Sequence, residues 1–145
     1  MNETPRRWLA AALLAAACYA AFGIAASAIG AAPVTARISL VARWGAFLLS
    51  GAAFLVHIAH EVRRGCSARQ AAWHVAVGAA LGGFGLALSA NLHELVAATG
   101  FRPRMLVALA AWPLLTGVPA YVGAFLLAAV LRRERDSGDA AKPRS

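Results

Sequence analysis

Four long apolar segments, separated by short polar ones, set the hydrophobic pattern of this chain. They cover roughly residues 8–32, 38–62, 71–95 and 105–131. A helix needs about 20 residues to cross a hydrocarbon core of about 30 Å, so each segment is long enough to span a membrane. None shows the alternation that the strands of a membrane barrel require. The pattern predicts an all-α fold: an integral membrane four-helix bundle that forms one domain over residues 1–131.

The composition agrees with this prediction, and the charges orient the bundle. The chain is 61% hydrophobic, and its mean hydropathy of +0.65 is above the range of soluble domains. Most of the 14 basic residues precede the first segment, separate the second from the third, or follow the fourth. Because short cytoplasmic segments retain lysine and arginine, we expect both termini in the cytoplasm of a bacterial-type inner (plasma) membrane. The polar residues 132–145 are expected to form a disordered cytoplasmic tail.

The same charge distribution argues against a nucleic-acid partner. The net charge of +8 is spread over several short segments. Nucleic-acid-binding proteins instead gather their basic residues into one continuous patch. The expected surroundings are the lipid bilayer and either further copies of this chain or another membrane protein.

The first apolar segment has a second interpretation. It follows Arg6 and Arg7 and ends among small residues, which is also the outline of a secretory signal peptide. The apolar part of a signal peptide is normally about 7 to 15 residues long, and this segment is longer. An uncleaved first helix is therefore favoured, and cleavage to leave three spans is the alternative.

Titratable side chains gather around the loop between the second and third segments. His57, His60 and Glu61 share one sector of a helix, and His74 follows on the next helix. Neutral imidazoles and a carboxylate suit zinc or iron, so these four residues form a candidate metal site. The spacing matches neither HExxH nor HxxEH. Because Glu61 and His60 lie close to Arg63 at the helix end, we expect both to be solvated.

His57 and His74 also form a candidate haem site. They lie on neighbouring antiparallel segments at a similar distance from the loop. Axial ligation from two facing helices is how a helical bundle holds a b-type haem. His57 and His74 are therefore predicted to bind either haem b or a divalent metal, while a chain with no cofactor is the leading expectation.

Small residues line one face of the third segment. Gly78, Gly82 and Gly85 fall within a sector of about 60°. Such a stripe lets membrane helices approach closely, so helix packing is the favoured interpretation. A flat cofactor or a permeant molecule lying against the glycines is the alternative.

A set of polar residues outside the titratable cluster predicts a path across the bundle. It consists of Ser50, Ser89, His93 and Glu94. Together with the histidines, these side chains would suit a proton-coupled carrier of small molecules or ions. Against that hypothesis, no ionisable residue lies near the bilayer centre, where coupling sites usually lie.

No arrangement of serine, cysteine and histidine here resembles an activated nucleophile, so enzymatic activity is not the leading expectation. Cys18 and Cys66 lie at different depths and are too far apart for a disulfide. The leading functional hypothesis is a small non-catalytic membrane subunit or accessory component. The alternatives are the proton-coupled carrier and a membrane redox protein that binds haem or metal through His57 and His74.

Overall fold

The computed structural model describes residues 5–31, 35–96 and 103–140. They form four helices: α1 (Pro5–Ala31), α2 (Ala36–Arg63), α3 (Ala68–Val96) and α4 (Pro103–Ala140). These described ranges contain no strand, and each helix is long and apolar enough to cross a membrane. The predicted all-α four-helix fold is confirmed, and the chain is a small multi-pass membrane protein.

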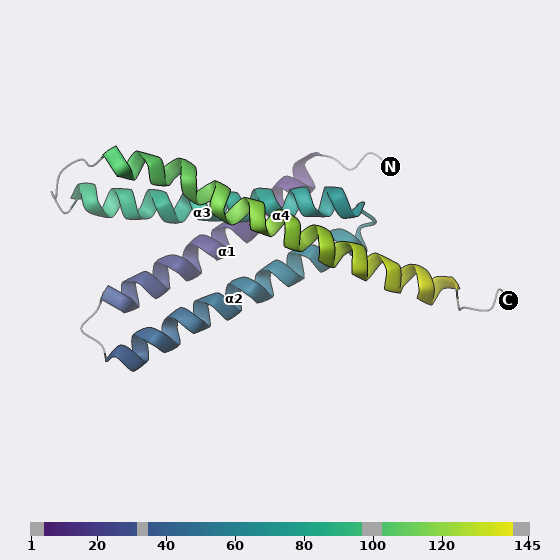
Figure 1. Cartoon of the computed structure of the whole chain (residues 1–145), viewed down its shortest axis with the longest axis horizontal. Helices are drawn as coiled ribbons and strands as arrows, with labels where there is room; N and C mark the ends of the chain where they lie inside the picture. Colours follow the sequence, from purple (N-terminus) through teal and green to yellow (C-terminus); the bar gives the residue numbers. More distant parts are fainter. Residues whose placement is uncertain (1–4, 32–34, 97–102, 141–145) are drawn as a thin grey trace.

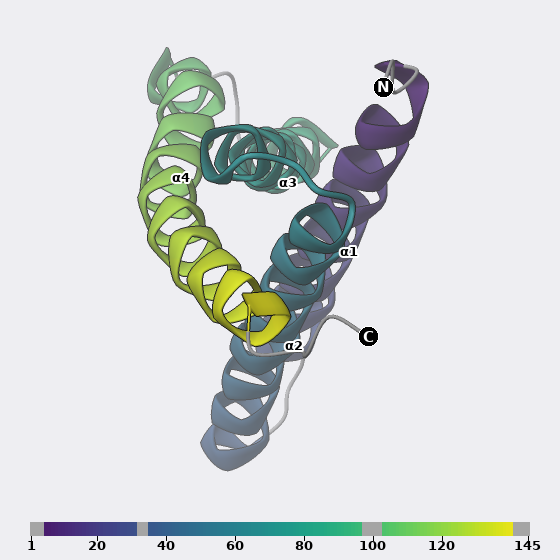
Figure 2. The same ribbon diagram turned by 90° about the vertical axis from the view of Figure 1, so that its right-hand side faces the viewer.

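Helix α3 is the centre of the arrangement (Figure 1 and Figure 2). It packs most extensively on α4 and α1, while α2 packs mainly along α1. Within the described residues, α1 and α4 make no backbone contact with each other. The helices lie closest together near the turn between α2 and α3, here called the turn end, and diverge toward the opposite end, here called the far end (Figure 1).

The turn between α2 and α3 is built by local hydrogen bonds. Gly65 adopts the left-handed conformation, with φ of 80°, which residues with a side chain rarely adopt. Ser67 then caps α3. Its hydroxyl accepts a hydrogen bond from the backbone amide of Gln70 at 3.2 Å, and its own backbone amide donates to the side-chain oxygen of Gln70 at 3.0 Å. This reciprocal pair is a capping box, which satisfies two amides at the helix start. The turn therefore fixes α2 and α3 as an antiparallel pair.

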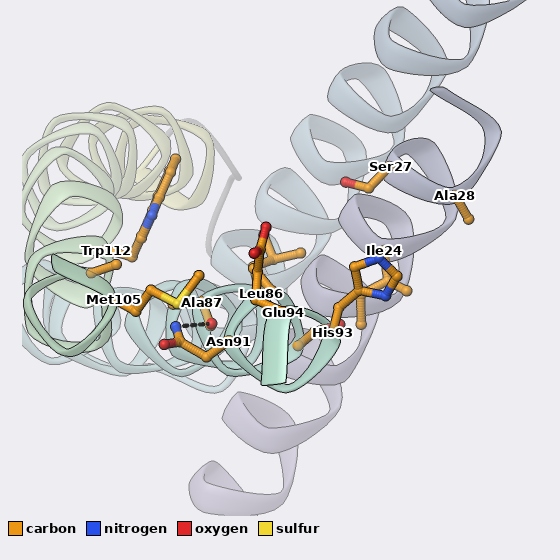
Figure 3. Close-up of a pocket in the computed structure, with 13 residues that line it drawn as sticks. Ile24, Ser27, Ala28, Leu86, Ala87, Asn91, His93, Glu94, Met105 and Trp112 are labelled. Atoms are coloured by element: carbon orange, nitrogen blue, oxygen red, sulfur yellow. Dashed lines mark hydrogen bonds between the residues drawn. The ribbon is translucent and has the colours of Figure 1, made fainter. Parts of the chain in front are cut away.

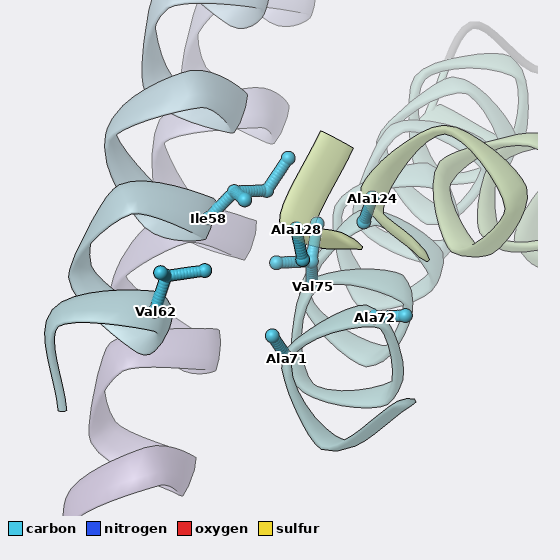
Figure 4. Close-up of a cluster of buried hydrophobic side chains, with 7 residues drawn as sticks. All are labelled: Ile58, Val62, Ala71, Ala72, Val75, Ala124 and Ala128. Atoms are coloured by element: carbon cyan, nitrogen blue, oxygen red, sulfur yellow. The ribbon is translucent and has the colours of Figure 1, made fainter. Parts of the chain in front are cut away.

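A small hydrophobic core joins three helices next to this turn (Figure 4). It contains Ile58 and Val62 of α2, Ala71, Ala72 and Val75 of α3, and Ala124 and Ala128 of α4. Alanine lets helix backbones approach closely, which is how membrane helices gain packing energy without a hydrophobic driving force between them. Beyond this core, α2 presents an apolar surface outward, with Phe47 69% exposed and Leu48 67% exposed.

The glycine stripe of α3 faces α1. A Cβ atom added to Gly78 would lie 3.2 Å from the Ala12 carbonyl oxygen, and one added to Gly82 would lie 2.8 Å from the Tyr19 Cβ atom. At Gly85, the corresponding distance to an alanine side chain of α1 is 3.3 Å. In this structure the groove left by the missing side chains is occupied by helix α1.

Gly82→Leu is expected to lower the free energy of unfolding by on the order of 1 kcal/mol, because overpacking a close contact forces neighbouring atoms apart. The added side chain would meet both Tyr19 and the Ala16 carbonyl oxygen, which lies 3.3 Å from the position that a Cβ on Gly82 would take. The measurement is the thermal midpoint of the detergent-solubilised protein. Gly51→Leu is the matched control, because nothing lies within 4 Å of its Cβ position. Equal midpoints for the two variants would contradict the close packing of α1 on α3.

Helix α4 extends into the segment that the sequence predicts to be disordered. It continues to Ala140, beyond the expected end of the span at residue 131, while residues 141–145 lie outside the described ranges. Two arginines attach this extension to the turn end. The Arg132 guanidinium donates to the Cys66 carbonyl, and that of Arg135 donates to the Val62 carbonyl at 3.3 Å. The Val62 carbonyl also accepts a hydrogen bond from the Gly65 backbone amide at 3.0 Å. The two arginines therefore attach the polar extension to backbone carbonyls at the end of α2 and in the turn.

Candidate metal centre at the turn end

Glu61 occupies the last turn of α2, and its side chain is completely buried, with 0% exposure. The expectation that Glu61 is solvated is therefore wrong. A helix end is exposed to water only when nothing packs over it. Here α3 packs against the last turn of α2, and Arg135 in the extension of α4 donates a hydrogen bond to the Val62 carbonyl of that turn.

The buried carboxylate of Glu61 lies close to three other side chains. Its Oε2 atom lies 2.6 Å from His74 Nδ1 and accepts a hydrogen bond from the Cys66 thiol at 3.3 Å. Its Oε1 atom lies 3.9 Å from the Arg64 guanidinium. One oxygen, one sulfur and one nitrogen from Glu61, Cys66 and His74 all lie within 4.8 Å of one another. We call these three residues the turn-end cluster.

Helix α1 orients the His74 ring by stacking an aromatic side chain on it. The Trp8 indole stacks on this imidazole with ring centroids 4.6 Å apart and an angle of 8° between the planes. Stacking fixes the plane of the ring, while the bond to Glu61 fixes its rotation. The cluster is thus held by three helices, although its donor atoms come only from α2, α3 and the turn between them.

His57 lies one turn before Glu61 and is only 5% exposed. Neither of its ring nitrogens has a hydrogen-bond partner in the protein. Its Cε1 atom lies 3.4 Å from the position that a Cβ on Gly78 would take, and the ring is close enough to Glu61 and His74 to interact with both electrostatically. An unpaired buried polar group costs about 1–3 kcal/mol, so a ligand that engages a nitrogen of His57 would be favoured.

No protein-family model, curated protein or solved structure matches the chain.

What this site could bind is therefore inferred from the chemistry of its donor atoms. Cysteine sulfur, histidine nitrogen and carboxylate oxygen are the three donor types that bind Zn²⁺ in proteins. Zinc sites are normally four-coordinate, and His57 is the neighbouring group with a lone pair to offer. In the present arrangement Glu61, Cys66 and His74 are linked by hydrogen bonds. Binding a metal ion would replace these bonds and release the protons that they contain.

The structure brings together three residues of the predicted metal set and separates one. His57, Glu61 and His74 lie at the turn end, whereas the His60 side chain is exposed. Cys66 is absent from the predicted set because it lies in the turn between the two helices, where helical spacing does not place a side chain. Its signal in the sequence is its position directly after Gly65, where a turn reverses the chain toward Glu61. Nothing in the local pattern indicates Trp8, which reaches the site from a distant part of the chain.

The remaining polar residues line two cavities elsewhere in the bundle. Ser89, His93 and Glu94 line a cavity of about 590 Å³ between α1, α3 and α4, here called the end cavity. Figure 3 shows Glu94 projecting from α3 into the space between α1 and α4. Ser50 lines a separate cavity of about 340 Å³, here called the central cavity, to which all four helices contribute. The predicted polar path is thus divided between two cavities, and neither cavity includes the turn-end cluster.

Proposed function

We propose that this membrane protein binds a divalent metal ion of the zinc type at its turn-end cluster. The observation that carries the proposal is the convergence of donor atoms from Glu61, Cys66 and His74 within 4.8 Å around a fully buried carboxylate. The unpartnered nitrogens of buried His57 beside this group provide independent support. A hydrogen-bonded pair that served only to join two helices would require neither the thiol nor a second imidazole.

A single metal ion fits this arrangement better than a haem does. A haem ligated by His57 and His74 would need a flat space between the two rings and the glycines of α3. Helix α1 occupies this region, since Ala12 lies against Gly78 and Trp8 stacks on His74. Haem binding would require α1 to move away from α3, whereas an ion requires only small movements of side chains.

We further propose that the protein acts as a non-catalytic, metal-binding component of a bacterial-type inner membrane. The distribution of arginines supports a topology in which both termini and the turn end face the cytoplasm. The metal would then bind just inside the cytoplasmic surface. The outward-facing apolar side of α2 supports contact with lipid or with a membrane partner, including a second copy of the chain.

The test is a zinc titration of the full-length protein purified in detergent, followed by metal analysis after removal of free ions. We expect one zinc ion per chain, with affinity lowered at least about tenfold by His74→Ala or Cys66→Ser, since each removes a ligand. His60→Ala is the matched control, because His60 is exposed and adjacent to Glu61.

The absence of stoichiometric zinc in the wild-type protein would overturn the proposal. Equal losses of zinc affinity in His60→Ala and His74→Ala would also contradict it. An absorption spectrum of the same sample distinguishes the haem hypothesis, because a Soret band lost in His57→Ala would favour haem.

A further inference from the structure

An open cavity at the turn end borders the proposed metal site. It measures about 790 Å³ and is formed by the first residues of α3, the residue that caps this helix, and one side chain of α4. We call it the turn-end cavity. The residues that line it are Ser67, Arg69, Gln70, Trp73, His74 and Tyr121.

His74 is the member of the turn-end cluster that lines this cavity. Its side chain is 16% exposed, whereas the Glu61 side chain, 2.6 Å away, is 0% exposed. His57 is only 5% exposed and does not line the cavity. A metal ion that enters from the turn-end cavity therefore meets His74 first and the buried carboxylate after it.

The groups that line this cavity beside His74 are suited to bind an anion. Arg69 is exposed near the start of α3, and within the described ranges no carboxylate pairs with its guanidinium. The Gln70 Oε1 atom accepts hydrogen bonds from the backbone amide and the hydroxyl of Ser67, both at 3.0 Å, so the amide nitrogen of Gln70 remains as a donor. A guanidinium fork and an amide donor match the oxygens of a carboxylate. Groups that suit an anion thus lie next to a cluster whose donor atoms suit a cation.

The surroundings of the cavity are strongly basic. Among the side chains that the structure describes at this end of the bundle, Glu134 is the one exposed carboxylate. Many arginines surround it, among them Arg63, Arg64, Arg69, Arg132, Arg133 and Arg135. A surface of one sign attracts ions of the opposite sign and can change their association rates by about 10- to 1,000-fold at low salt. A free divalent cation is therefore repelled from the entrance to the site, while an anion is attracted to it.

We propose that the turn-end cavity is the entrance to the metal site and that it receives the metal as a small anionic chelate, bound by carboxylates, instead of the free ion. Small-molecule sites measure about 300–1,000 Å³, and the cavity of about 790 Å³ is within this range. Arg69 and Gln70 bind carboxylates of the chelate, and His74 is the first protein ligand to bind the metal. That this metal is of the zinc type rests on the proposed function.

The transfer is an exchange of ligands. The metal moves from the carboxylates of the chelator to His74, Glu61 and Cys66. The chelator leaves as the free anion. The protons displaced from the Cys66 thiol and from the hydrogen bond between His74 and Glu61 leave with the chelator or with water.

The rate of loading tests this entrance in the full-length, metal-free protein in a neutral detergent. Cobalt(II) is the probe, because it binds the donor types that zinc binds and absorbs light through its bond to a thiolate. It is supplied either as its anionic complex with nitrilotriacetate or as a cationic complex with a neutral polyamine of comparable affinity. We expect the anionic complex to load the protein at least about tenfold faster at low salt. Salt at about 1 M, where the screening length is about 3 Å, should remove the difference.

Arg69→Gln should remove most of the rate advantage of the anionic complex. The final cobalt occupancy should not fall, because Arg69 supplies no ligand to the metal. Arg63→Gln is the matched control, since Arg63 is exposed at the same end of the bundle but does not line the cavity. Equal loading rates for the two complexes in the wild-type protein, or equal decreases in the two variants, would overturn the entrance. If zinc and cobalt bind but the charge of the complex has no effect, the proposed function stands and the entrance alone is wrong.

A measurement without metal tests whether anions gather in the cavity. Trp73 lines it, is 60% exposed, and becomes the only indole when the other three of the four tryptophans are changed to phenylalanine. Quenching of Trp73 fluorescence by iodide, relative to quenching by neutral acrylamide, should decrease at least about twofold in Arg69→Gln and persist in Arg63→Gln. Iodide quenching that does not respond to Arg69→Gln would overturn the anion site. If the protein binds no metal but iodide behaves as expected, the proposed function and the metal chelate fail, while an anion-binding cavity remains.

Discussion

Glu61→Gln is expected to abolish the stabilisation that zinc gives to the folded protein. At a free zinc concentration of about 100 times the dissociation constant, a ligand that binds only the folded state adds about 2.7 kcal/mol to the free energy of unfolding. Glutamine preserves the size of the side chain and can still accept the bond from His74, which lies 2.6 Å from Glu61 in the wild-type protein. It removes the negative charge that makes the carboxylate a metal ligand. The thermal midpoint with and without zinc measures the effect.

Glu94→Gln is the control for this prediction, because Glu94 is also a glutamate in a membrane-spanning helix but lines the end cavity. It should retain the full zinc-dependent shift. Comparing each variant with itself, with and without metal, removes any change that the substitution makes to the metal-free protein. If zinc stabilised Glu61→Gln as much as the wild-type chain, Glu61 would not be a ligand.

Ile58→Ala is expected to lower the free energy of unfolding by about 2 kcal/mol, the lower end of the range for such core truncations. Ile58 is completely buried and carries the contact between α2 and the alanines of α3 and α4 (Figure 4). When the bundle unfolds within a membrane, the Ile58 side chain would contact lipid instead of water. The free energy of transferring it out of the core therefore contributes little to this cost. Lost dispersion contacts and the cavity left behind account for the remainder.

Val56→Ala is the matched control for Ile58→Ala, because Val56 lies on the same helix and is 69% exposed. Its thermal midpoint in detergent should remain close to that of the wild-type protein. A similar decrease in the thermal midpoint of both variants would mean that α2 is not held in the bundle through this core. Since His57 and Glu61 flank Ile58 on α2, Ile58→Ala should also weaken zinc binding by loosening the helix that carries them.

Part of the turn-end site is predictable from residue spacing. His57 and Glu61 are four residues apart, which places them on one side of a helix, and His74 follows on the next antiparallel helix. A short loop between two spans is enough to bring these side chains to the same end of the bundle. Spacing does not reveal how deeply each group is buried, and the expected solvation of Glu61 is wrong for that reason, since its side chain has 0% exposure.

The sequence by itself determined the class of the fold and the number of its helices. Backbone amides in lipid must be satisfied within a segment, so four apolar stretches of this length have one regular solution. Only the tertiary structure decided which groups meet. Trp8 and Arg132 come from opposite ends of the chain, and both reach the region of the turn between α2 and α3. Such contacts depend on how α1 and α4 pack across α3, which local spacing does not encode. The same packing buries Glu61 beside Cys66 and turns a short polar stretch at the end of α2 into the candidate metal centre.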